Sequence, residues 1–302
     1  MSDGIRTATL AAPPALAPAL ARGALLSPFK RPRAGAGCPA DRLVLPGVRI
    51  DLARLAAYER VCGFPTGEDA LPLTYPHVLG FPLAMRLMSH PRFPLPLLGL
   101  VHTSIDIARH TATPATGVYE LAVHVAGLAP HRRGTEATVV TGLRRDGDVV
   151  WESTSTYLAR HRTASGQRGP SGPSGPSDAP RKPEGARPSL PVRGEWRLAA
   201  DLGRRYAAVS GDRNPIHLHP LGARLFGFPR TVAHGMWTVA RCLAAHGTPE
   251  AALVRARFRA PVLLPATVRH AAADDGRFAL HGDGRTHLEG SVRPADPSDG
   301  RR

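Results

Sequence analysis

The chain has 302 residues, of which 42% are hydrophobic and 21% are charged, so it is not disordered overall and can bury one large core or two small ones. Its formal net charge is +15, but the excess arginine is spread along the chain without zinc-finger spacing or an RNA-binding aromatic strand, so we expect no nucleic-acid partner. We instead expect the positive field to attract an anionic small molecule, and no membrane span, since no run of about 18 apolar residues is present.

The N-terminal residues 1–44 predict an irregular segment with one short helix near 15–26. They are rich in Ala, Pro and Leu, but prolines interrupt the apolar part, so we expect no secretory signal. The three cysteines, Cys38, Cys62 and Cys242, have neither metal-ligand nor CxxC spacing. This sparse set is typical of a reducing compartment, and we therefore expect a cytoplasmic protein without a metal site.

Residues 45–162 predict a first unit of helices and strands. A short strand and a helical stretch occupy 48–64, and an apolar helix that opens at Gly80 follows within 77–88. Alternating apolar and polar residues then predict strands at 117–125, 136–145 and 148–161, with RDGD as a hairpin turn.

A low-complexity segment separates this unit from a second one. Residues 163–190 contain the triplet GPS three times in a row and predict a flexible linker, because this composition buries too little apolar surface to become ordered. Residues 191–295 then repeat the first unit, and 296–302 form a tail.

The repeat is visible residue by residue. The stretch 196–212 corresponds to 48–64, and a second apolar helix within 232–243 opens at Gly235 as the first does at Gly80. The corresponding residues of the first pair are Tyr58 and Tyr206, Val61 and Val209, and Gly63 and Gly211. The second unit predicts strands at 266–273, 276–282 and 286–293.

Two copies of one unit predict an α+β fold in which two antiparallel sheets each wrap around a central helix. One such sheet alone leaves its helix poorly covered and an edge exposed, whereas two side by side remove both problems.

The loop 206–217, YAAVSGDRNPIH, carries the densest polar group of the chain. Gly211 and Asp212 can form a simple helix stop, and Asn214 can cap the next helix with Pro215 in its first turn, which would leave His217 at the surface. The first unit has Phe64 in place of Asp212 and lacks the Asn-Pro-x-His pattern. The polar residues are thus confined to one copy, which favours a site over a structural loop.

The residue types in this loop suit acid–base chemistry. A rigid loop can hold the carboxylate of Asp212 and the imidazole of His217 around one water molecule, with the Asn214 amide to orient it. The backbone N–H of Gly235, at the start of an apolar helix, can donate to an enolate oxygen.

The stretch from YAAVSGDRNPIH to AHGMW resembles the signature of the MaoC-like dehydratases, the (R)-specific enoyl-CoA hydratases known as hydratase 2, which have a hot-dog fold. With its degenerate first unit, the whole chain resembles the double-hot-dog members found in actinobacteria, over 45–162 and 190–295. The resemblance implies that Asp212 and His217 hold the water, that Asn214 assists, and that Gly235 donates to the thioester oxygen. It also implies that the first unit forms an acyl pocket, a role that its apolar stretch 95–100 fits.

The resemblance further implies the reaction, a reversible syn hydration of trans-2-enoyl thioesters to (R)-3-hydroxyacyl thioesters in fatty-acid or polyketide-type metabolism. The carrier is coenzyme A or an acyl carrier protein, and no metal or redox cofactor is needed. One alternative is a hot-dog thioesterase, but such enzymes place a carboxylate on the central helix, and 236–247 contains none. The other is a non-catalytic acyl-binding partner protein.

Further residues carry weaker predictions. Arg213 and Arg257 are expected to meet the carrier phosphates, and Met236 and Trp237 to line the core or the pocket wall. His234 is expected to support the loop without a catalytic role. Among the residues that we expect to be structural or at the surface are His77, His102, Arg224, Arg230, Arg255 and Arg259. A fused pair of units is compatible with a monomer that acts as a pseudo-dimer or with a homodimer.

Overall fold

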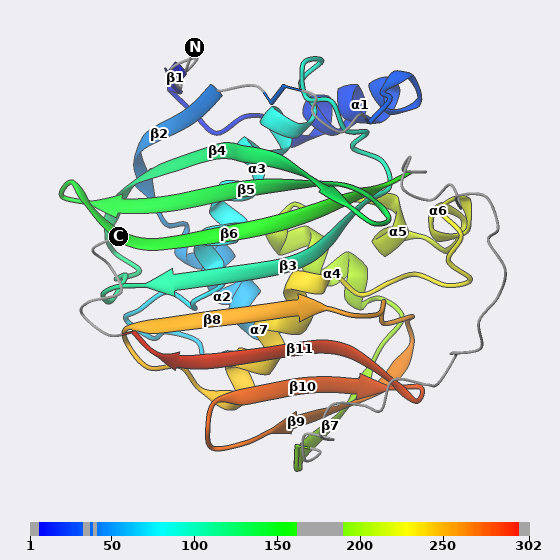
Figure 1. Ribbon diagram of the computed structural model, residues 1–302. Coiled ribbons are helices and arrows are strands. Elements are labelled where there is room, and N and C mark those ends of the chain that lie inside the picture. The colour runs from blue at the N-terminus through cyan, green and yellow to red at the C-terminus, as the bar shows by residue number, and fades with distance from the viewer. Residues whose placement is uncertain (1–5, 33–36, 39–40, 162–189, 296–302) are drawn as a thin grey trace, which may run out of the picture.

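A computed structural model of the chain describes residues 6–32, 37–38, 41–161 and 190–295 (Figure 1). The predicted tail and, apart from residue 190, the predicted linker lie outside the described residues. The α+β architecture is confirmed, and its strands form one eleven-stranded sheet in the order β1-β2-β4-β5-β6-β3-β8-β11-β10-β9-β7. All neighbouring strands are antiparallel except β1 and β2.

The first half contributes six strands and three α-helices, with one short 3₁₀ helix. In chain order these are β1 (Arg6–Thr9), α1 (Leu16–Leu26), η1 (Ser27–Phe29), β2 (Asp41–Arg49), α2 (Leu52–Cys62), α3 (Tyr75–Met88), β3 (Leu100–Arg109), β4 (Val118–His131), β5 (Gly134–Arg145) and β6 (Asp148–Arg160).

The second half repeats this plan with five strands and adds two short helices. Its elements are β7 (Val192–Leu198), α4 (Leu202–Ser210), α5 (Pro215–Leu218), α6 (Pro220–Leu225), α7 (Gly235–His246), β8 (Ala252–Phe258), β9 (Ala266–Ala272), β10 (Arg277–Gly282) and β11 (Arg285–Pro294).

The predicted repeat is confirmed in backbone geometry. Helices α2 and α4 both end at a glycine in the left-handed region, Gly63 with φ of 79° and Gly211 with φ of 82°, and each glycine amide donates to the carbonyl four residues earlier. Glycine is favoured there because it has no side chain to clash in that conformation. The chain therefore leaves both helices in the same direction, toward Phe64 in one half and Asp212 in the other.

The two sheets that the repeat predicts are joined into one by β3 and β8. These strands pair from Ser104 with Arg257 to Arg109 with Ala252. Buried Arg109 links the two halves at this boundary. Its guanidinium donates to the carbonyl oxygens of Leu71 in the first half and of Pro249 and Glu250 in the second, at 3.1, 2.8 and 2.6 Å. Neither half keeps a free edge at this boundary, which removes the edge exposure that a lone sheet carries.

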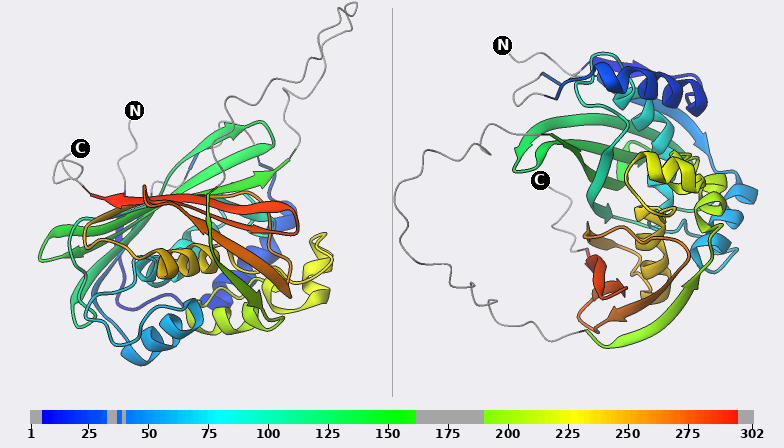
Figure 2. Two further views of the ribbon diagram at one scale, coloured as in Figure 1. Left: turned by 90° about the horizontal axis from the view of Figure 1, so that it is seen from below. Right: turned by 90° about the vertical axis from the view of Figure 1, so that its right-hand side faces the viewer.

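The helices lie on one face of the sheet (Figure 2). The buried apolar residues of α3 and α7 join those of both halves of the sheet in one hydrophobic core. Helix α2 contacts α4 and α7 across the boundary, and the Trp237 indole donates to the carbonyl of Val61 at 2.9 Å. In the described parts of the chain, none of the helices has the length and hydropathy needed to cross a bilayer.

Two sequence expectations need correction. The predicted irregular segment holds the expected helix α1, but also strand β1 and the start of β2, because β1 gains backbone partners by adding parallel to β2 from Arg6 with Asp41 to Thr9 with Val44. Gly80 does not open its helix, since α3 begins at Tyr75. A side chain at Gly80 would lie 2.6 Å from Cγ2 of Thr141, so this glycine lets α3 approach β5 closely.

Candidate active site

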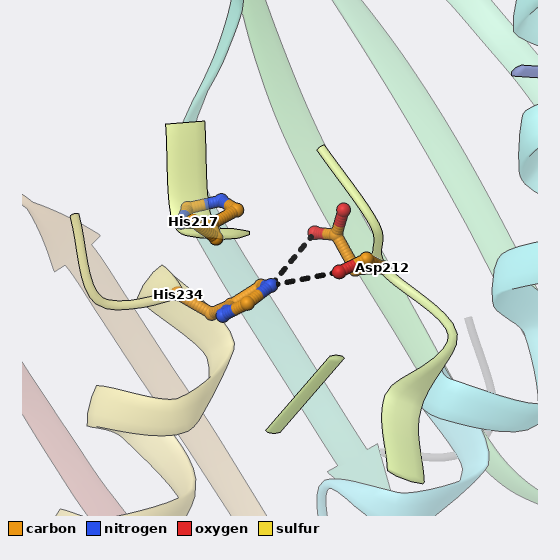
Figure 3. A group of neighbouring side chains, drawn as sticks. All are labelled: Asp212, His217 and His234. Atoms are coloured by element: carbon orange, nitrogen blue, oxygen red, sulfur yellow. Dashed lines mark hydrogen bonds and ion pairs between the residues drawn. The ribbon is translucent and has the colours of Figure 1, made fainter. Parts of the chain in front are cut away.

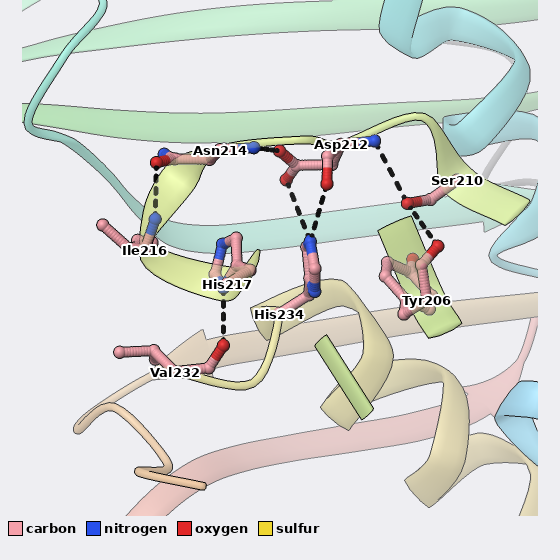
Figure 4. Close-up of polar contacts among 8 residues, drawn as sticks. All are labelled: Tyr206, Ser210, Asp212, Asn214, Ile216, His217, Val232 and His234. Carbon is pink, nitrogen blue, oxygen red and sulfur yellow. Dashed lines mark hydrogen bonds and ion pairs between the residues drawn. The ribbon is translucent and has the colours of Figure 1, made fainter. Parts of the chain in front are cut away.

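A ladder of local hydrogen bonds from backbone amides to side-chain oxygens holds the loop that follows α4 (Figure 4). The Ser210 hydroxyl accepts from the Asp212 amide, and Oδ1 of Asp212 accepts from the Asn214 amide, each at 3.2 Å. The side-chain oxygen of Asn214 then accepts from the Ile216 amide at 3.3 Å. Each bond spans two residues, which is the local turn that Ser, Asp and Asn side chains favour. Local sequence therefore fixes the loop, while Oδ2 of Asp212 lies outside the ladder.

The capping alternative is correct for Asn214 and wrong for His217. Asn214 is the N-cap of α5, with Pro215 in the first turn, so its oxygen is committed to the backbone and its amide nitrogen is the part left for other partners. His217 is buried with an exposed fraction of 9%, whereas His219 is exposed and caps α6.

The backbone partner of His217 selects one tautomer of its neutral ring. Its Nδ1 lies 2.6 Å from the carbonyl oxygen of Val232, which can only accept, so the neutral ring carries its proton on Nδ1 and presents a lone pair at Nε2. Burial lowers the pKa of His217, although the Asp212 carboxylate and the bond to Val232 oppose this change. The side chain is therefore a neutral base near pH 7.

His234 secures the backbone of Asp212. Its Nε2 lies 2.9 Å from the carbonyl oxygen of Asp212, so Nε2 carries the proton and donates it to that bond. Burial, together with His217, lowers the pKa of His234 well below its ordinary value, so the 3.9 Å approach of Nε2 to Oδ2 is not an ion pair of charged groups near neutral pH. The ring also stacks on His217, with centroids 3.7 Å apart and planes 25° from parallel.

The three side chains converge at one place in the molecule (Figure 3). A carboxylate oxygen of Asp212 and one ring nitrogen from each of His217 and His234 all lie within 4.8 Å of one another. One water molecule with hydrogen bonds of about 2.8 Å can bridge such a span. These donor types also occur in metal sites, but here Nδ1 of His217 and Nε2 of His234 are each committed to a main-chain carbonyl. The arrangement suits proton transfer through a shared water.

Gly235 begins α7 beside this group, as the sequence predicts. Among the described residues its backbone N–H has no hydrogen-bond acceptor, as expected for the first turn of a helix. A side chain at this position would lie 2.9 Å from the Phe258 ring. The absence of a side chain thus lets the start of α7 approach β8 and leaves the amide uncovered.

Backbone bonds hold the two segments of the site together. The Val232 amide donates to the Ile216 carbonyl at 3.0 Å, and the Ala233 amide donates to the Val262 carbonyl at 2.9 Å. In α4, Gly203 packs directly against the carbonyl of His217, where a larger residue would meet that oxygen. The positions of His217 and of the start of α7 are therefore coupled.

The residues predicted to bind substrate do not all lie near the dyad of Asp212 and His217. Arg213 is exposed directly beside it. Met236 and Trp237 are buried in the core, and Trp237 is directed to α2 through its bond to Val61. Arg257 is placed away from the site: it alternates with buried Ala256 and lies on the outer face of the sheet, where it pairs with Asp106 at 2.8 Å.

The apolar stretch expected to line an acyl pocket packs mainly beneath the N-terminal segment. The Leu98 amide donates to the Ser27 hydroxyl at 2.9 Å, and Leu97 lies against Gly23 of α1. Other first-half residues are within electrostatic reach of the dyad. The Asp212 carboxylate raises the pKa values of His77 and Tyr157, although burial has the larger effect on both and leaves the pKa of His77 at about 4. The large separation in sequence hides this proximity. The one feature of the sequence that could have indicated it is that His77 lies in the first turn of the helix that corresponds to α7.

Comparisons with known proteins agree with this arrangement. Residues 177–286 match the MaoC-like domain family. The chain is 38% identical over 253 residues to 3-hydroxyacyl-thioester dehydratase X of Mycobacterium tuberculosis, which covers 81% of this chain and 86% of that protein. The crystal structure of HtdX from Mycobacterium tuberculosis superposes with a TM-score of 0.71 at 34% identity, covering 84% of this chain and 100% of that one. An alignment of 86 residues with the fatty acid synthase subunit beta of Aspergillus oryzae is 40% identical and covers 25% of this chain and 4% of that protein.

Proposed function

Because the chain belongs to the MaoC-like dehydratase family, we propose that it catalyses the reversible hydration of trans-2-enoyl thioesters to (R)-3-hydroxyacyl thioesters in fatty-acid or polyketide-type metabolism. The predicted double-hot-dog fold is confirmed by the same comparisons, with its two sheets joined into one. The observation that best supports the proposal is the neutral His217, whose Nδ1–H is committed to Val232 and whose Nε2 is left as a base near the Asp212 carboxylate.

The proposed reaction uses a water molecule shared by Asp212 and His217. In the hydration direction the water oxygen bonds to C3 while the dyad takes one proton from the water, and the dyad then passes that proton to C2. The C2–C3 double bond becomes a single bond, and the reverse sequence releases water. The Gly235 N–H stabilises the negative charge that develops on the thioester oxygen between these two steps. The amide of Asn214 orients the water or the substrate.

The carrier side of the substrate is coenzyme A or an acyl carrier protein in this proposal. Arg213 is the exposed cation nearest to the dyad in sequence and is the residue that we expect to meet carrier phosphates. The proposed steps require no redox cofactor and no metal ion. The protein is expected to act in the cytoplasm, as a monomer that is itself a pseudo-dimer or as a homodimer.

Substitution of the dyad tests the proposal. Asp212→Asn and His217→Gln should each reduce kcat/KM for crotonyl-CoA hydration by about 10²–10⁴-fold, because each removes a positioned acid–base group. Asp283→Asn is a matched control, since Asp283 is exposed in the hairpin between β10 and β11 and asparagine tolerates its positive φ. Circular dichroism and thermal unfolding verify that the variants remain folded.

The alternatives give different results in the same assay. Release of free coenzyme A without hydration of any enoyl chain length would identify a thioesterase and contradict the proposed reaction. Binding of acyl thioesters without hydration or hydrolysis would identify an acyl-binding partner protein instead.

A further inference from the structure

A wall of flat side chains from the first half faces the dyad. His77 comes from the first turn of α3, His102 from β3 and Tyr157 from β6. The His102 ring stacks on Tyr157, with centroids 4.5 Å apart and planes 17° from parallel, and on His77 at 5.9 Å and 15°. We call these three side chains the first-half wall.

The wall adjoins the atoms that are proposed to react. Burial has the larger effect on the pKa values of His77 and Tyr157, but the Asp212 carboxylate raises both, so its charge reaches the wall. The Phe258 ring lies against Gly235 and is 4.9 Å from the His102 ring, so one aromatic side chain separates the helix start from the wall. A substrate with C2 and C3 at the dyad can thus extend its acyl chain along the wall.

Two ring nitrogens of the wall lack a hydrogen-bond partner. Among the described residues, Nδ1 of His77 and Nε2 of His102 are buried atoms without a hydrogen-bond partner. Burial lowers the pKa of His77 to about 4 and that of His102 to about 3, so both rings are neutral at physiological pH. Both residues are half-buried as a whole, and because the χ2 torsion of histidine is broad, a ring rotation can exchange the positions of a ring nitrogen and a ring carbon.

A plain alkyl chain is a poor match for this wall. It would cover both nitrogens without offering either of them a hydrogen bond, and unpaired buried polar groups are unfavourable. A hydroxyl group both donates and accepts, so its proton can satisfy a ring nitrogen that carries no proton and its oxygen can satisfy a ring nitrogen that carries one. We propose that the first-half wall is a specificity site for acyl chains that carry a hydroxyl group beyond C3.

The test rests on the proposed hydration reaction and compares substrates of equal length. The values of kcat/KM are measured for hex-2-enoyl-CoA and for its analogues with a hydroxyl at C4, C5 or C6. We expect the wild-type protein to favour at least one hydroxylated analogue about tenfold or more, because a site built to hydrogen-bond discriminates against a substrate that lacks the group. His77→Phe and His102→Phe should each reduce this preference about tenfold.

A matched control separates the wall from a general effect of removing a buried histidine. His270 on β9 is also buried with an unpartnered Nε2, but it stacks on Trp196 at the far side of the second half, so His270→Phe should leave the preference unchanged. All three phenylalanine variants remove an unpaired polar atom, so they are expected to fold.

The outcomes are distinct. A wild-type protein that prefers hexenoyl-CoA to all three analogues overturns the inference, whether or not the variants fold. A preference that survives both wall substitutions also overturns it, because the hydroxyl group is then recognised elsewhere. Hydration of none of the four thioesters would instead count against the proposed reaction itself.

Discussion

At the scale of single residues, the site depends on where two histidine protons lie. His217 donates through Nδ1 and His234 through Nε2, each to a main-chain carbonyl. The first bond leaves a base at Nε2 of His217, and the second holds the backbone of Asp212. Sequence spacing predicts Asp212 and His217 because they belong to one short loop, but the donor role of His234 depends on a fold that brings residues 22 positions apart into contact.

His234→Phe should separate positioning from packing. Phenylalanine keeps a ring to stack on His217 but cannot donate to the Asp212 carbonyl, so we expect kcat to fall about 10–100-fold while KM changes little. Stability should change little, because the lost bond to the Asp212 carbonyl is offset by the removal of a buried imidazole with an unpartnered Nδ1. Steady-state kinetics and denaturant unfolding measure the two effects.

The conservative variant His234→Gln provides the check on this prediction. Its side-chain amide retains a donor, so it should recover part of the lost kcat. Equal activity of the phenylalanine and wild-type proteins would show that the bond to Asp212 has no role in the reaction.

At the scale of elements, the helix stops and hairpins were predictable from local sequence, whereas the close contacts were not. RDGD gives the turn between β5 and β6, and Gly63 and Gly211 end their helices, because turn chemistry is local. The place of Gly80 within α3 and the addition of β1 to the sheet depend on neighbours distant in sequence. Periodicity alone therefore misplaced the start of α3 and missed β1.

Gly203→Ala should disturb the site through α5. The new methyl group would meet the carbonyl oxygen of His217, so α4 and α5 must separate. We expect a loss of about 1–3 kcal/mol in the free energy of unfolding, as is typical of overpacking, and a fall of at least about tenfold in kcat.

Gly142→Ala in β5 is the matched control for this substitution. A methyl group there meets no atom within 4 Å, and unfolding and activity should stay close to wild type. Full activity of the Gly203→Ala protein would show that the contact between α4 and His217 does not position the base.

At the scale of the whole molecule, buried neutral histidines link stability to pH. Burial lowers the pKa values of His77 and His270 to about 4 and that of His102 to about 3, against 6.5 in the unfolded chain. Between pH 6.5 and 4 the unfolded state therefore binds more protons than the folded state, so stability is lost as the pH falls through this window. Each of these histidines lowers the free energy of unfolding by up to about 1.4 kcal/mol for each pH unit within this window.

Denaturant unfolding at pH 7 and at pH 5 measures this loss. Since His270→Phe removes one of the contributing groups, its stability should depend less steeply on pH than that of the wild type. A free energy of unfolding that is the same at both pH values would show that these histidines titrate normally in the folded protein.

The duplication itself was predictable at this scale, but the way the halves combine was not. Corresponding residues identified two units, yet only the pairing of β3 with β8 reveals one sheet and brings His77, His102 and Tyr157 toward a dyad in the other half. Such contacts arise from tertiary packing, and a single sequence carries no local pattern for them.

Tyr58 and Tyr206 occupy corresponding positions in the two halves, and their rings lie 6.0 Å apart at the boundary. In a symmetric pair of identical chains, a residue near the axis meets its own copy, and every mutation is made twice. Here the two tyrosines have diverged in their partners: the Tyr58 hydroxyl pairs with Thr74, while the Tyr206 ring borders His234. Fusion into one chain lets natural selection alter the half that is proposed to meet the acyl chain without altering the half that is proposed to carry out the reaction.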